Sequence, residues 1–289
     1  MDFDTFMAQA WKDHADQPDV VAQRLREGTA LVADEGQLVL LMNLAHHVHG
    51  EHLGNWRAGI AFIDGLAELA PYAADGPSGQ ARARFVVALE LSAGSEAGFA
   101  GLSISDRIRV GALAAANLGR RDTTRALQLL QEALALAQRA GLAASDPMNR
   151  ALAVSGNNLA MTLELQPTRS AEERELMILA AQTGRQFWGI AGTWLETERA
   201  EYRLAMTWLQ AGDRDRAREH ARACLQTIEA NRGAAIERLF GWEALGLVER
   251  AAGNAAAHAQ ALAGAREAFD EVDEDDKAWC AESIEKLAA

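Results

Sequence analysis

A short segment near the N-terminus gathers four histidines and a glutamate within seven positions. His46, His47, His49, Glu51 and His52 lie in the stretch LAHHVHGEHLG. Imidazole nitrogens and carboxylate oxygens are ligands for Zn²⁺, and two histidines three or four residues apart on a helix can bind one ion. The segment is therefore a candidate metal site, which would need a further ligand from a distant part of the chain.

The spacing divides these residues between two sides of a helix. An α-helix turns 100° per residue, so His46, His49 and His52 lie along one side, whereas His47 and Glu51 share another. The metalloprotease motif HExxH is absent here, and HxxEH would need a histidine where Val48 stands. The candidate metal ligands are His46, His49 and His52, and packing or contact with a partner is the favoured alternative.

Composition predicts an all-α protein. Of 289 residues, 49% are hydrophobic and 24% charged, with only five prolines, which is typical of a folded helical chain. The formal net charge of −13 opposes binding to phosphate backbones and anionic lipid, so we expect no nucleic-acid and no membrane partner. The acidic start MDFD and two isolated cysteines, Cys224 and Cys280, predict a cytoplasmic protein.

Short turns separate pairs of helical segments at a regular interval. Turns near residues 119, 167, 212 and 253 give a period of roughly 45 residues, and no stretch alternates apolar and polar residues as a strand would. Ser170 and Glu173 predict a capping box at one helix start. A period of this size in a helical chain indicates a solenoid, in which each helix pair buries its apolar face against its neighbours.

The repeat positions resemble those of tetratricopeptide repeat (TPR) proteins, in particular the longer-period, kinesin-light-chain-like variants. In GDRDRAREHARACL, Ala217 and Ala221 occupy the small positions of the second helix, and Trp242 to Gly246 reproduce W-x2-L-G. The resemblance covers residues 36–272. It implies one domain over 1–289, a right-handed superhelical solenoid of antiparallel helix pairs.

The two ends and one internal stretch depart from the repeat pattern. Residues 1–35 predict a degenerate N-terminal helix pair, with Pro18 at a helix start. Residues 73–103 predict a single helix between Gly/Ser-rich turns. Residues 273–289 predict a C-terminal capping helix that closes the stack. Thirteen or fourteen helices are expected in total.

The resemblance also implies a function and a set of binding residues. First helices of TPR pairs line a concave groove that binds a peptide or a protein segment, so we expect a non-enzymatic adaptor or regulatory protein with no cofactor and no catalytic residues. P-loop and dinucleotide-binding motifs are absent. The predicted groove residues are Met42, His46, His49, Asn157, Met161, Glu164, Arg199, Tyr202, Met206, Glu243, Leu247 and Arg250.

Two other functions stay open at this stage. The histidine segment would suit a metal-binding protein or a metal-dependent enzyme. Exposed solenoid ends can also pair with each other, which would give a self-associating scaffold and a homo-oligomer.

Overall fold

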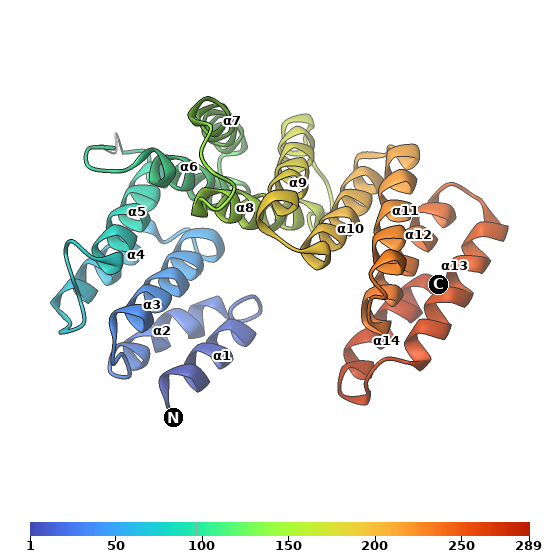
Figure 1. The fold of residues 1–289 in the computed structure, drawn as a ribbon, viewed down its shortest axis with the longest axis horizontal. Coiled ribbons are helices and arrows are strands. Elements are labelled where there is room, and N and C mark those ends of the chain that lie inside the picture. The colour runs from blue at the N-terminus through green and yellow to red at the C-terminus, as the bar shows by residue number, and fades with distance from the viewer. Residues whose placement is uncertain (96–97) are drawn as a thin grey trace. The chain divides into compact units, whose positions relative to one another are not determined.

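The computed structural model describes residues 1–95 and 98–289. In these two ranges the chain forms fourteen α-helices and no β-strand. It divides into two compact units, Met1–Met148 and Asn149–Ala289. Consecutive helices pack against each other within each unit, which Figure 1 shows as neighbouring coils along the colour gradient.

The N-terminal unit begins with the predicted helix pair. Its helices are α1 (Phe3–Asp13), α2 (Pro18–Thr29), α3 (Glu35–His47), α4 (Trp56–Gly65), α5 (Pro77–Ser92), α6 (Ile104–Leu118) and α7 (Thr123–Ala140). Two short turns, a π-turn at Val48–His52 and a 3₁₀ turn at Leu66–Glu68, follow α3 and α4. The single helix predicted within 73–103 is α5, and residues 96–97 of the same stretch lie outside the described residues.

The C-terminal unit holds the second half of the helices. They are α8 (Pro147–Glu164, which starts at the boundary), α9 (Ala171–Ala191), α10 (Trp194–Ala211), α11 (Arg214–Ala230), α12 (Ala235–Ala251), α13 (Ala255–Asp270) and α14 (Glu274–Ala288). The last of these, α14, coincides with the predicted capping helix and packs against both α12 and α13. Its Cys280 and Leu287 are fully buried in this contact.

Local sequence explains several helix ends. Ser170 and Glu173 form the predicted capping box before α9: the Ser170 hydroxyl accepts the Glu173 N–H at 3.1 Å, and the Glu173 carboxylate accepts the Ser170 N–H at 2.6 Å. Pro18 is the first residue of α2, where its missing N–H costs no helical hydrogen bond. Gly212 and Gly253 have φ of +87° and +73°, a left-handed conformation that favours glycine.

Small residues let the paired helices pack closely. Ala217 and Ala221, predicted for the small positions of a helix crossing, are fully buried on α11. Gly156 on α8 lies so close to α9 that an added Cβ would be 2.6 Å from the Ala180 carbonyl oxygen. The all-α class and the packing of helices in neighbouring pairs are thus confirmed, and both are compatible with a helical repeat. The single-domain organisation stays a prediction.

None of the helices in the described ranges combines the length and the apolar character that crossing a bilayer requires.

Candidate functional site

The histidine segment does not continue as a regular α-helix. α3 ends at His47, and in the π-turn that follows the Leu53 N–H donates to the Val48 carbonyl at 3.0 Å. This i→i+5 hydrogen bond widens the turn, so residues five apart come to lie on the same face. His47 and His52 are five apart and share a face, which the α-helical spacing did not predict.

Gly50, at the middle of the π-turn, allows a close approach of α6. An added Cβ at Gly50 would lie 2.4 Å from the Asn117 Oδ1 atom, closer than non-bonded atoms approach. Asn117 is fully buried, and its Nδ2 donates to the Ser92 hydroxyl at 3.0 Å and lies 3.4 Å from the His46 Nε2. The π-turn is therefore held by packing against α6.

Three predicted groove residues pack in the core of the N-terminal unit. Met42, His46 and His49 are 0%, 1% and 8% exposed, because α4, α5 and α6 cover this side of α3 and its π-turn. The His46 ring stacks on Phe85 with centroids 5.0 Å apart, and burial lowers the pKa of His46 to about 4, so it is neutral at pH 7. The side on which an open groove was predicted is thus the buried side of this helix.

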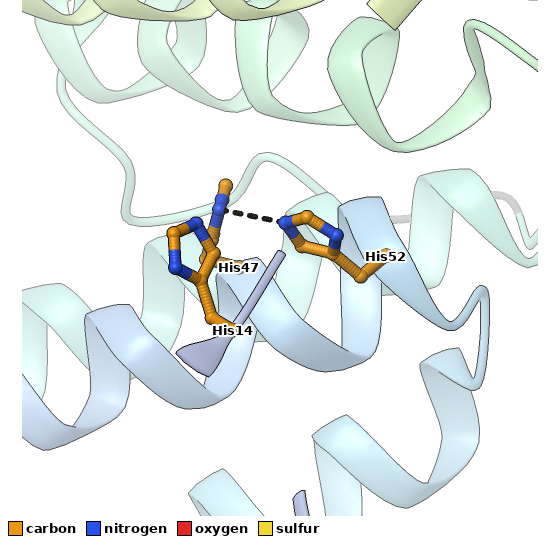
Figure 2. A group of neighbouring side chains, drawn as sticks. All are labelled: His14, His47 and His52. Atoms are coloured by element: carbon orange, nitrogen blue, oxygen red, sulfur yellow. Dashed lines mark hydrogen bonds between the residues drawn. The ribbon is translucent and has the colours of Figure 1, made fainter. Parts of the chain in front are cut away.

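A different trio of histidines converges at the end of α3. His14, just after α1, meets His47 and His52, and one ring nitrogen of each lies within 4.8 Å of the other two (Figure 2). The His47 and His52 Nε2 atoms are 3.1 Å apart. Of the predicted ligand set, only His52 belongs to this group. His46 and His49 face the core instead.

The partners of these rings fix their orientation. The His47 Nδ1 lies 3.0 Å from the Glu51 carboxylate, and the His14 Nδ1 lies 2.5 Å from the Trp11 carbonyl oxygen, to which it donates. Burial lowers the pKa of His47, but the charge and hydrogen bond of Glu51 outweigh it and raise the pKa overall. Burial, followed by the charge of His47, lowers the pKa of His52 to about 4.

The predicted groove residues of the C-terminal unit vary in exposure. Met161, Arg199 and Arg250 are exposed, whereas Asn157, Glu164 and Tyr202 are half-buried. The other three, Met206, Glu243 and Leu247, are buried.

Contacts between alternate helices bring several of these residues together. Glu164 of α8 accepts hydrogen bonds from Arg203 and Thr207 of α10, and Arg199 of α10 pairs with Glu237 of α12. Tyr202 of α10 donates to the Glu243 carboxylate of α12 at 3.0 Å. The first helices of successive pairs are therefore joined side by side by charged and polar groups.

An aromatic row follows the same helices. The rings of Tyr202 (α10) and Phe240 (α12) have centroids 6.2 Å apart, and those of Phe240 and Trp279 (α14) are 5.2 Å apart. Trp279 is 65% exposed. Beside the row, Lys286 of α14 lies 3.5 Å from the Glu243 carboxylate. We call this surface the aromatic face; it comprises Arg199, Tyr202, Glu237, Phe240, Glu243, Trp279 and Lys286.

A buried carboxyl group lies behind the aromatic face. Glu198 of α10 is 2% exposed, and its Oε2 accepts the Cys224 S–H at 3.2 Å. Burial, and then the neighbouring carboxylate of Glu237, raise the pKa of Glu198 well above its ordinary value. Burial raises the pKa of Glu237, but the hydrogen bonds from Arg199 and Glu198, together with the charge of Arg199, outweigh it and lower this pKa overall.

Glu198→Gln is expected to flatten the pH dependence of stability in the C-terminal unit. In the folded wild type Glu198 stays protonated up to about pH 8, whereas in the unfolded chain it ionises near 4.5. Wild-type stability therefore falls as pH rises between these values, and glutamine removes this component. Chemical denaturation at pH 5 and pH 8 measures the difference. Exposed Glu219→Gln on α11 is the control, and an unchanged pH difference in Glu198→Gln would contradict this ionisation.

The predicted site residues leave out His14 and His47 of the histidine cluster. They also leave out four residues of the aromatic face, which are Glu237, Phe240, Trp279 and Lys286. His14 stands alone in the first predicted turn, although five of the seven histidines of the chain fall within its first 52 residues, which is a usable signal. Phe240 and Trp279 lie on the same side as Tyr202, but only the packing of α12 and α14 places them in one row. No local sequence feature indicates that alignment.

The sequence was also compared with known proteins. Models of known protein families give no match to the chain, and curated proteins give no match to its sequence.

Proposed function

We propose that this protein is a non-enzymatic helical-repeat adaptor that binds a peptide segment of a partner protein on the aromatic face. The resemblance to TPR proteins supports this proposal, because first helices form the binding surface in that family. The proposal extends to the finer architecture that the resemblance implies, a right-handed superhelix. It also retains the predicted cytoplasmic location.

The observation that carries the proposal is the aromatic row across α10, α12 and α14, in which Tyr202 and Phe240 are half-buried and Trp279 is exposed. A tryptophan that is 65% exposed and stacked on Phe240 leaves a large apolar surface in water, at a place where Tyr202 continues the row. Aromatic side chains offer large contact area at low entropic cost, and they dominate binding energy in many interfaces. The row therefore suits apolar side chains of an extended segment.

The charges beside the row favour an acidic segment. The side chains of Arg199 and Lys286 are 61% and 54% exposed, whereas those of Glu237 and Glu243, with which they pair, are 8% and 4% exposed. The cations thus lie toward solvent and the carboxylates lie beneath them. A guanidinium has five N–H donors, so Arg199 keeps donors for a partner carboxylate after pairing with Glu237.

The test uses a phage-displayed library of random peptides selected on the purified full chain. Wild type is expected to enrich peptides that combine apolar and acidic residues. Fluorescence polarisation of an enriched peptide should then show at least a tenfold loss of affinity in Trp279→Ala, because a central aromatic contact contributes about 2 kcal/mol or more. Charge reversal in Arg199→Glu should also lower the affinity for the same peptide.

Glu219→Ala, an exposed change on α11, is the matched control and should bind like wild type. A library without enriched peptides, or equal binding by Trp279→Ala, would refute the proposal. Light scattering at the same concentrations distinguishes peptide binding from self-association, which is the remaining alternative. An oligomer that Trp279→Ala dissociates would assign the aromatic face to a second copy of the chain, as in a self-associating scaffold.

A further inference from the structure

The trio of His14, His47 and His52 is an arrangement that packing alone does not require. The three rings come from two segments, the end of α1 and the end of α3 with its π-turn, and they converge with one nitrogen each (Figure 2). Ring centroids lie 4.8 to 5.0 Å apart for all three pairs. The hydrogen bond between the His47 and His52 Nε2 atoms accounts for the approach of that pair. The convergence of a His14 nitrogen on both of them is the feature that a shared ligand explains.

The hydrogen-bond partners outside the cluster leave a lone pair on the ring nitrogens of His14 and His47 that face the cluster. The His14 Nδ1 donates to the Trp11 carbonyl, so the His14 Nε2 carries the lone pair. The His47 Nδ1 faces Glu51, which leaves its Nε2 toward His52. Metal-binding histidines usually donate their second ring N–H to a carboxylate or a backbone carbonyl, and both kinds of partner occur here.

The spacing of the nitrogens fits a single small ion. Two nitrogens bound at about 2.0–2.1 Å in tetrahedral geometry lie about 3.3 Å apart. The His47 and His52 Nε2 atoms are 3.1 Å apart, and the third nitrogen is within 4.8 Å of both. His14 lies in the turn that follows α1, outside the regular helix.

We propose that His14, His47 and His52 together bind one divalent late transition-metal ion, of which Zn²⁺ is the representative. Three imidazole ligands suit Zn²⁺, Ni²⁺ and Cu²⁺, and exclude the oxygen-preferring Mg²⁺ and Ca²⁺. Glu51 and the Trp11 carbonyl orient two of the rings. Three protein ligands leave a fourth tetrahedral position for water or another small ligand.

Bound metal has a defined structural consequence. His14 follows α1, whereas His47 and His52 end α3 and its π-turn, so the ion joins the N-terminal helix pair to the next helix. An ion that binds only the folded arrangement stabilises it by mass action. Zn²⁺ is thus expected to raise the thermal midpoint of the wild-type chain, and a chelator is expected to reverse the increase.

The experiment is isothermal titration calorimetry of the untagged full chain with ZnCl₂ after removal of metal by EDTA and dialysis. Wild type should bind one Zn²⁺ per chain with a micromolar or lower Kd. His52→Gln and His14→Gln should each weaken binding at least 100-fold, and Glu51→Gln by about 10–100-fold. His258→Gln removes a histidine from α13 and should bind like wild type.

The outcomes separate the metal site from a histidine cluster that only packs. Circular dichroism checks that each variant keeps its helix content. If His52→Gln does not fold, His14→Gln takes its place as the test variant, because His14 lies in a turn and its substitution disturbs no helix. Absence of stoichiometric Zn²⁺ binding to wild type overturns the proposal. Equal binding by the folded histidine variants overturns it as well, and so does an identical thermal response to MgCl₂ and ZnCl₂.

Discussion

Gly156→Val is expected to lower the free energy of unfolding of the C-terminal unit by about 3 kcal/mol. A Cβ at this position would lie 2.6 Å from the Ala180 carbonyl oxygen and 2.8 Å from the Gly184 amide nitrogen. Both are backbone atoms of α9, so no side-chain rotation relieves the contact and the two helices must separate. Urea denaturation followed by circular dichroism gives the change in free energy.

Gly189→Ala provides the matched control, since Gly189 is exposed on the same helix α9. The nearest atom to its added Cβ is the Nη1 of the flexible Arg185 side chain, at 3.2 Å. Alanine also favours a helix over glycine by about 0.5–1 kcal/mol, so this variant should equal or exceed wild type in stability. A Gly156→Val protein as stable as Gly189→Ala would show that α8 and α9 do not cross closely at Gly156.

Arg203→Met is expected to cost about 3 kcal/mol, because it leaves the Glu164 carboxylate buried without its cation. The side chains of Glu164 and Arg203 are only 7% and 18% exposed. Burial already raises the pKa of Glu164, against the opposing charge of Arg203. Without Arg203 the pKa of Glu164 rises further, so the Glu164 carboxyl becomes protonated in the folded state at pH 5. The variant should therefore lose more free energy of unfolding, relative to wild type, at pH 8 than at pH 5.

A second substitution tests this cause directly. Arg203→Met/Glu164→Gln removes the unpaired charge while keeping an oxygen that accepts the Thr207 hydroxyl, so it should recover most of the lost stability and its pH dependence should disappear. Lys277→Met breaks an exposed pair with Glu274 and should change stability by about 0.5 kcal/mol or less. Equal deficits at pH 5 and pH 8 would count against the buried charge as the cause.

The two proposed sites lie in different units and are tested independently. The histidine cluster belongs to the N-terminal unit, and the aromatic face belongs to the C-terminal unit. Substitutions at His52 are therefore expected to leave peptide binding intact, and Trp279→Ala is expected to leave Zn²⁺ binding intact. The pattern of losses in the two assays separates failure of one proposal from failure of the other.

Local sequence determined the helices and many of their ends. A helix cap and a turn depend on interactions within a few residues, so a sequence pattern can detect them. This holds for the capping box of Ser170 and Glu173 and for the glycine-containing turns, whose regular recurrence gives the period of roughly 45 residues. The small positions Ala217 and Ala221 were predicted in the same way, because a helix crossing needs small side chains. The exposed and buried sides of α3 were predicted less well, since they depend on which neighbours cover that helix.

Tertiary structure alone decided which residues form the two candidate sites. A regular α-helix would align His46, His49 and His52, but the π-turn held by Gly50 against α6 turns His52 toward His47 instead. His14 joins them from another segment through the packing of α1. The row of Tyr202, Phe240 and Trp279 likewise exists only because α10, α12 and α14 lie side by side. Helix propensity acts over neighbouring residues, whereas these sites depend on contacts between helices that lie far apart in the chain.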